Sequence, residues 1–217
     1  MRQNSRRSIQ LTLISDTHDL HRELEVPDGD ILIHAGDFTM FSKSLRSIED
    51  FNTWLGDLPH RHKIVVPGNH EFFLEADPHR RSLLSNAIVL INEAVDIEGL
   101  RIWGSPVTPL FGGAFGMASA EDRRRLYAQI PEDIDVLITH GPPYQILDAD
   151  LESGVHSGCR ELFDAVMRVR PKLHVFGHIH GGYGIFQTRD TTFVNAALLG
   201  MHGDIDQAPV VLNMQRE

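Results

Sequence analysis

The sequence predicts an α/β fold in which two β-sheets pack face to face and helices cover the outside. Five short apolar runs of the kind that form buried strands recur along the chain, and each ends in a loop that carries Asp, His or Asn. About ten strands stand against only four helices, which favours a two-sheet sandwich over one doubly wound sheet. The 217 residues suffice for one domain with a well-buried core.

The strands are recognised by apolar runs that lie between turn signals. The five buried strands are expected at residues 9–14, 31–33, 64–66, 136–138 and 173–176. Further strands are expected at residues 87–91, 95–97, 101–103, 183–187, 191–194 and 210–212. No linker or low-complexity segment divides the chain. We therefore expect a single domain over residues 8–217, preceded by a disordered N-terminal end at residues 1–7.

Helical spacing of apolar residues, together with capping residues, predicts the helices. Ser44, Asp77 and Ser119 stand at the starts of three of them as N-cap residues, and Pro171 follows the end of the last. The expected helices span residues 44–56, 77–84, 119–130 and 158–170.

Composition and charge narrow the classes of function. A hydrophobic content of 41% and a net charge of −10 are those of a soluble protein without an extended nucleic-acid-binding surface. The apolar stretch after the basic N-terminus stops at Ser15, too short for a signal peptide or a membrane span. The single cysteine, Cys159, suits a reducing compartment. We expect a cytoplasmic protein that binds no membrane; nothing in the sequence indicates its oligomeric state.

Metal-binding residue types follow each of the five buried strands. The motifs are Asp16-Thr17-His18, Gly36-Asp37, Gly68-Asn69-His70-Glu71, Thr139-His140-Gly141 and Gly177-His178-Ile179-His180. Ligands of open α/β sheets bind beyond the carboxyl ends of the strands, so these loops should converge on one rim. The Asp-x-His and His-x-His spacings put two ligands on the same side of an extended segment.

The donor types also narrow the choice of metal. The set mixes nitrogen and oxygen without a thiolate, which favours Mn, Fe, Zn or Co over Ca or Mg. Gly36 allows a sharp turn that presents Asp37, whose two carboxylate oxygens could bridge two cations.

Taken together, the five motifs resemble the full signature of the calcineurin-like metallophosphoesterase superfamily, in the right order and over the whole chain after Ser8. Within the superfamily, several runs resemble the metallophosphoesterase-domain-containing (MPPED) subfamily, whose members are similar to class III cyclic nucleotide phosphodiesterases. These runs are residues 32–39, 138–143, 174–180 and 182–184. The resemblance implies a four-layer fold in which two mixed sheets are flanked by helices.

The resemblance also implies a centre of two divalent cations, with Mn the one expected to support activity in vitro. One cation would be held by Asp16, His18, Asp37 and His180. The other would be held by Asp37, Asn69, His140 and His178, so that Asp37 bridges the pair. The expected reaction is in-line attack on phosphorus by a hydroxide that bridges the metals.

His70 matches the catalytic histidine of the family and would protonate or stabilise the leaving oxygen. Glu71 is expected to orient the backbone or a neighbouring ligand and not to bind metal. Phosphoprotein phosphatases carry Asp-Arg-Gly after their Gly-Asp, whereas Gly36-Asp37 is followed by Phe38-Thr39. This difference argues against protein dephosphorylation, and it leaves the group that orients His70 unidentified.

The expected function is hydrolysis of small phosphodiesters, with 2′,3′- or 3′,5′-cyclic nucleotides as the first expectation. Two alternatives stay open: a phosphomonoesterase, and a regulatory protein that binds AMP or GMP with incidental turnover. Some members of the subfamily have glycine in place of the second histidine of Gly-His-x-His, and they bind nucleotide with poor activity. The presence of His180 favours a working enzyme.

Three further residues are candidates for contact with substrate. Phe38 could stack on a base, although core packing is the commoner fate of phenylalanine. His156 lies in a loop that could shape the pocket, and Asn195 could support the rim by hydrogen bonding. His34 and His174 lie within strands and are expected to have structural roles.

Overall fold

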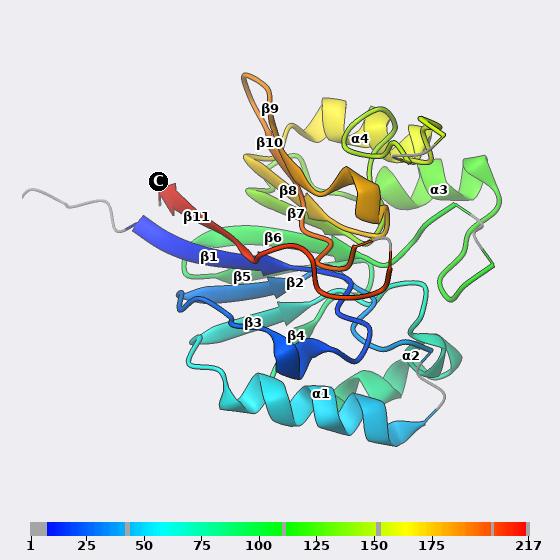
Figure 1. Cartoon of the computed structure of the whole chain (residues 1–217). Helices are drawn as coiled ribbons and strands as arrows, with labels where there is room; N and C mark the ends of the chain where they lie inside the picture. Colours follow the sequence, from blue (N-terminus) through cyan, green and yellow to red (C-terminus); the bar gives the residue numbers. More distant parts are fainter. Residues whose placement is uncertain (1–7, 42–43, 110–111, 151–152, 201, 216–217) are drawn as a thin grey trace, which may run out of the picture.

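Two β-sheets form the centre of the molecule in the computed structural model, which describes residues 8–41, 44–109, 112–150, 153–200 and 202–215 (Figure 1). The first sheet has the order β11-β1-β2-β3-β4. Its strands are β1 (Ser8–Ile14), β2 (Ile31–His34), β3 (His62–Val65), β4 (Ile88–Val89) and β11 (Val210–Gln215). Strands β1 to β4 are parallel, and β11 pairs antiparallel with β1. The end predicted to be disordered, residues 1–7, lies outside the described residues.

The second sheet has the order β5-β6-β7-β8-β10-β9. Its strands are β5 (Glu93–Ile97), β6 (Leu100–Ser105), β7 (Val136–Thr139), β8 (Leu173–Phe176), β9 (Gly184–Gln187) and β10 (Thr192–Asn195). The four central strands are parallel, and the edge strands β5 and β9 are antiparallel to their neighbours. Both sheets are therefore mixed, which confirms the predicted fold class.

Helices cover the outer face of each sheet, which completes four layers (Figure 1). The α-helices are α1 (Leu45–Asp57), α2 (Phe72–Ala76), α3 (Ala120–Tyr127) and α4 (Arg160–Val169). Short 3-10 turns are η1 (His21–Glu23), η2 (Pro78–Leu83) and η3 (His180–Gly182). Helix α1 lies against the first sheet, whereas α3 and α4 lie against the second. Among the described residues, no helix combines the length and the apolar character that crossing a bilayer requires.

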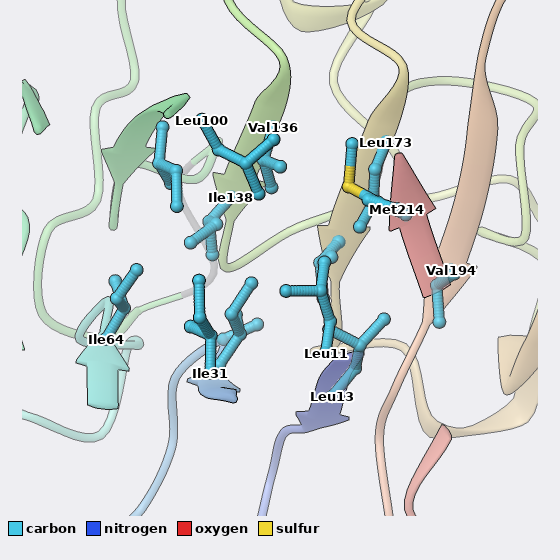
Figure 2. Close-up of a cluster of buried hydrophobic side chains, with 14 of the residues drawn as sticks. Leu11, Leu13, Ile31, Ile64, Leu100, Val136, Ile138, Leu173, Val194 and Met214 are labelled. Atoms are coloured by element: carbon cyan, nitrogen blue, oxygen red, sulfur yellow. The ribbon is translucent and has the colours of Figure 1, made fainter. Parts of the chain in front are cut away.

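Successive side chains of a strand point to opposite faces of its sheet, which explains the layered packing. Ile31 and Ile33 point into the space between the sheets, while Leu32 between them packs toward α1. Figure 2 shows the inter-sheet core, where Leu11 and Leu13 of β1 meet side chains of the second sheet. Because both faces of the central strands β2, β7 and β8 are covered, these strands read as nearly continuous apolar runs.

The helix starts were predicted with mixed success. The side chains of Asp77 and Ser119 accept hydrogen bonds from His79 N and Asp122 N, at 3.0 and 3.2 Å. Ser44 occupies the N-cap position of α1, but its side chain makes no capping hydrogen bond. The segment expected to be helical at residues 77–84 forms the 3-10 turn η2, and the five-residue helix α2 was not predicted.

Candidate metal centre

Five loops meet at the carboxyl ends of β1, β2, β3, β7 and β8, as the sequence predicted. Backbone hydrogen bonds join the loops to one another: Asp16 N donates to Gly36 O at 2.9 Å, and Gly177 N donates to His140 O at 2.9 Å. Between the sheets, His140 Nδ1 donates to Ala35 O and the His178 N–H donates to the Asp16 carboxylate, so residues of both sheets meet at one rim and the predicted ligands gather there.

One cluster at this rim consists of Asp16, His18 and His180, whose ligand atoms lie within 4.8 Å of one another. Asp16 Oδ1 is 3.4 Å from His180 Nε2 and 4.0 Å from His18 Nε2. The Asp16 carboxylate is fully buried and is fixed by the backbone N–H of His178, at 3.1 Å from Oδ1 and 3.0 Å from Oδ2. The first set of predicted ligands is therefore in place around one point.

A second cluster consists of Asp37, His140 and His178. His140 Nε2 lies 3.3 Å from Asp37 Oδ2 and 2.8 Å from Asn69 Oδ1, so Asn69 belongs to the same group. The other ring nitrogen of His140, Nδ1, donates to Ala35 O at 3.0 Å. This bond leaves Nε2 as the nitrogen that can bind a cation.

Asp37 lies between the two clusters. Its Oδ2 atom is 3.8 Å from His18 Nε2 on one side and 3.3 Å from His140 Nε2 on the other. Such a shared carboxylate can bind both cations of a dinuclear site, which is the role that the sequence predicted for Asp37.

Four of the predicted ligands have an unusual backbone conformation. Asp16, His18, Asp37 and His178 have φ angles of 55°, 42°, 54° and 69°, in the left-handed region that few residues other than glycine adopt. Such conformations persist where the surrounding structure enforces them, and they cluster at functional sites.

Glycines make room for these ligands. A Cβ atom on Gly68 would lie 2.2 Å from Asp37 Oδ1, and one on Gly177 would lie 2.0 Å from Asp16 Oδ2. Any side chain at either position would displace a carboxylate, which explains why glycine precedes the ligands in these motifs.

Glu71 joins two of the ligand loops. Its fully buried carboxylate accepts hydrogen bonds from Asp37 N and Thr39 N, both at 3.0 Å, from Thr39 Oγ1 at 2.9 Å and from Gly68 N at 2.6 Å. Burial and the negative charge of Asp37 raise the pKa of Glu71 to about 8, so its ionised form depends on these four donors. Glu71 therefore orients the loops that carry Asp37 and Asn69.

The carboxylates of the centre shift the pKa values of the histidines beside them. Burial lowers the pKa of His140, but the Asp37 carboxylate outweighs this effect and raises the pKa to about 9. Burial likewise lowers the pKa of His180, and a hydrogen bond with Asp16 raises it above the ordinary value. The buried carboxylates thus favour the protonated form of these two histidines. The donor set fits two divalent cations, which would displace these protons.

His70 lies beside the two clusters. Its Nε2 atom is 4.0 Å from Asp37 Oδ2, and its backbone N–H donates to Asp37 Oδ1 at 2.9 Å. Its other ring nitrogen, Nδ1, donates to the backbone carbonyl of Met40. The orienting group that sequence reasoning left unidentified is therefore a peptide carbonyl, which no side-chain motif could have indicated.

A cavity of about 290 Å³ opens over the clusters. Its lining consists of His18, Asp37, Met40, Asn69, His70, His178, His180, Leu199 and Gly203. Leu199 and Gly203 were not predicted as site residues, because they lie after the last motif and neither has a side chain that binds metal.

Two of the three candidate substrate contacts lie elsewhere. The ring of Phe38 is fully buried and stacks on Phe51 of α1, with centroids 4.3 Å apart, so it packs in the core and not against a substrate. Asn195 is also fully buried; its Nδ2 donates to Leu147 O at 3.1 Å and to Ile179 O at 2.8 Å. Asn195 therefore supports the rim, as the hydrogen-bonding interpretation expected, without lining the cavity.

His156 is the remaining candidate. Its Nδ1 atom lies 2.6 Å from Oδ1 of the buried Asp148, and its side chain is 41% exposed. It is not among the described residues that line the cavity, so its contact with substrate stays a prediction.

Two buried histidines support the ligand loops from within the sheets. His34 Nε2 pairs with Thr17 Oγ1 at 3.1 Å, and His174 Nε2 pairs with Thr139 Oγ1 at 2.8 Å. Each threonine directly precedes or follows predicted ligands. Both histidines have the structural role that the sequence predicted.

Comparison with known proteins agrees with this geometry. The family described as calcineurin-like phosphoesterase matches residues 9–182. The chain belongs to the calcineurin-like phosphoesterase family. The chain is therefore a metal-dependent phosphoesterase, a hydrolase of phosphate esters. Its clusters of Asp and His could hold the metal ions.

Several known proteins are similar to this chain over most of its length. Metallophosphoesterase domain-containing protein 1 of Homo sapiens is 37% identical over 93% of this chain and 69% of its own length. UPF0046 protein K07C11.7 of Caenorhabditis elegans is 35% identical over 96% of this chain and 76% of its own. The solved structure of phosphopantetheinyl hydrolase from Mycobacterium tuberculosis aligns with a TM-score of 0.59 at 19% identity, over 89% of this chain and 90% of that one. That likeness shows a shared fold.

Proposed function

We propose that the chain is a phosphodiesterase that hydrolyses small phosphodiesters, with 2′,3′- or 3′,5′-cyclic nucleotides as the first candidates and Mn as a cation that supports activity in vitro. The observation that carries this proposal is the charge of the cavity. No Lys or Arg belongs to its described lining, although such residues commonly bind phosphate. Apart from bound cations, the cavity offers little to the second negative charge of a monoester, whereas a diester carries only one.

The size of the cavity favours a small substrate. A volume of about 290 Å³ lies at the lower end of the range for small-molecule sites. The net charge of −10 would repel an extended polyanion from the rest of the surface. Both properties support a single nucleotide or a similar small diester over a nucleic-acid chain.

Each group of the site has a separate task in the proposed reaction. Two divalent cations held by the clusters would neutralise phosphate charge and make water a better nucleophile at neutral pH. Asp16 and Asp37 hold the histidine ligands in place, and Glu71 fixes the loops that carry Asp37 and Asn69. His70 borders the cavity with its side chain 22% exposed, so its Nε2 atom can reach the leaving group.

The reaction consumes one water molecule. A bond forms between the water oxygen and phosphorus while the bond from phosphorus to the leaving oxygen breaks. His70 protonated on both ring nitrogens keeps its Nδ1–H on Met40 O and gives its Nε2 proton to the departing oxygen, and a proton from the attacking water restores it. An open diester yields a phosphomonoester and an alcohol, whereas a cyclic nucleotide yields one nucleotide that carries both groups, so atoms and charge balance.

A substrate panel on Mn-loaded protein tests the proposal. We expect turnover of bis(p-nitrophenyl) phosphate and of at least one cyclic nucleotide, with little turnover of p-nitrophenyl phosphate. His70→Ala should lower turnover of the cyclic nucleotide, whose leaving alkoxide needs a proton, by about 10²- to 10⁴-fold, the usual contribution of general acid–base catalysis.

Each alternative function has a distinct signature in the same panel. Faster turnover of the monoester would identify a phosphomonoesterase instead. Tight retention of AMP or GMP without any diester turnover would identify a nucleotide-binding protein. Either result would overturn the proposal.

A further inference from the structure

We propose that Met40 and Phe41 together position the imidazole of His70 for proton transfer, so that Phe41 is a positioning residue of the reaction. The inference rests on the proposed function, in which His70 protonates the leaving oxygen. It assigns a role to a segment that lies outside the five ligand motifs.

The carbonyl of Met40 fixes which nitrogen of His70 faces the site. It accepts a hydrogen bond from Nδ1, so Nδ1 carries a proton and points away from the cations. Nε2 is then turned toward Asp37 Oδ2, at 4.0 Å, and toward the cavity. In many enzymes a side-chain carboxylate orients a catalytic histidine in this way; here a peptide carbonyl does so.

Met40 is itself held in place from two sides. Its backbone N–H donates to Asp19 Oδ2 at 2.9 Å. The preceding residue, Thr39, is fully buried and bonded to Glu71 through both its N–H and its hydroxyl. The carbonyl is therefore a fixed acceptor, because the backbone before it is anchored to two different loops.

Phe41 covers the imidazole of His70. The two rings are stacked, with centroids 4.9 Å apart and an interplanar angle of 20°. His18 meets the same imidazole edge-on, with centroids 4.6 Å apart and an angle of 74°. These contacts restrict rotation of the imidazole about its own axis. Phe41 is 48% exposed, so burial in a core does not account for its position.

Loss of the ring of Phe41 should affect proton transfer more than substrate binding. A leaving group of high pKa needs a well-aligned acid, whereas p-nitrophenolate departs without much help. The two effects separate when diphenyl phosphate and bis(p-nitrophenyl) phosphate are compared on the same Mn-loaded protein.

For Phe41→Ala we expect kcat for diphenyl phosphate to fall about 10- to 100-fold, and kcat for bis(p-nitrophenyl) phosphate to fall less than about 3-fold. Phe41→Tyr, which keeps the ring, should restore both. The matched control is Phe186→Ala on β9, which removes an equally exposed ring (47%) remote from the cavity lining and should change neither.

A second readout does not depend on activity. In the metal-free protein, ¹⁵N chemical shifts of the neutral form of His70 should report a single tautomer protonated at Nδ1. Phe41→Ala should shift these values toward the average of two tautomers. Unchanged shifts, or an equal loss of kcat for both substrates, would overturn the inference.

His70→Ala separates failure of the inference from failure of the proposed function. If His70→Ala leaves diphenyl phosphate turnover unchanged, the role of His70 as an acid is wrong and the inference falls with it. If His70→Ala is slow while Phe41→Ala behaves like wild type, only the role of Phe41 is wrong.

Discussion

Each half of the centre combines two buried ligands with one that is partly buried, and the clearest contrast is between His140 of one half and His180 of the other. In the half formed by Asp37, His140 and His178, the side chain of His140 is fully buried and bonded to the backbone of Ala35. In the half formed by Asp16, His18 and His180, the side chain of His180 is 29% exposed, although Asp16 beside it is fully buried. His140 is therefore an enclosed ligand, whereas His180 is partly open to solvent.

This difference separates chemistry from stability. An enclosed ligand such as His140 serves both, because its removal leaves a buried charge without its close partner. A partly exposed ligand such as His180 serves chemistry, and its removal affects stability little because water can replace it.

Asp37→Asn should have the largest effect, because it weakens the one residue shared by both halves. Loss of about 4 kcal/mol of transition-state stabilisation corresponds to roughly a thousand-fold drop in diester turnover. Turnover and bound Mn per chain are the measurements. Asp96→Asn on β5, where the carboxylate is 73% exposed, is the control and should behave like wild type. Retention of full turnover by Asp37→Asn would refute the shared role.

His140→Ala and His180→Ala should separate the enclosed ligand from the partly exposed one. Without metal, loss of His140 takes from the buried Asp37 its nearest charged partner and should cost about 3 to 5 kcal/mol of unfolding free energy. Loss of the partly exposed His180 should cost less than about 1 kcal/mol, because water can enter the space it leaves beside Asp16. Urea unfolding of both metal-free variants measures the difference. Equal losses would show that the burial of a ligand does not set its effect on stability.

Glu71→Gln should weaken metal binding without abolishing it. An amide in place of the carboxylate turns one –NH₂ toward backbone N–H groups that now donate to Glu71. Disturbed support of metal ligands typically costs 10- to 100-fold in affinity, and we expect about 10-fold here because one amide oxygen remains. Titration with Mn measures the affinity, and an unchanged dissociation constant would exclude this role of Glu71.

A further effect concerns pH and His174, which lies behind the ligand loops. Burial lowers the pKa of His174 to about 3, from 6.5 in the unfolded chain. Because the folded pKa is the lower one, the unfolded state binds the proton first as pH falls. The neutral form therefore stabilises the protein above pH 6.5, and this stability is lost as pH falls from there toward 3.

Between pH 7.5 and pH 5, His174 should account for about 2 kcal/mol of the loss in unfolding free energy of the metal-free protein. His174→Asn should reduce the pH dependence by that amount, as urea unfolding at the two pH values would show. An identical slope in wild type and variant would count against a neutral buried His174.

Most of the fold and the ligand set follow from short-range sequence patterns. Ile31 and Ile33 alternate with Leu32, which places the strand between two cores, and the ligands directly follow such strands. Helix α2 was missed because five residues are too few to show helical periodicity.

The contacts that depend on backbone direction could not be predicted. The left-handed turn at Asp37 is followed by Phe38 pointing into the core, so a residue next to a ligand lies away from the site. Likewise, Met40 orients His70 through a carbonyl that every residue type has, so its identity carries no signal.

We propose that one pair of cations, shared through Asp37, enables diester hydrolysis. The decisive measurement is titration of metal-stripped protein with Mn while bis(p-nitrophenyl) phosphate turnover is followed. We expect no turnover in the stripped protein and a maximum at two bound Mn per chain. Full turnover after complete chelation, or a maximum at one bound Mn, would refute a shared pair of cations.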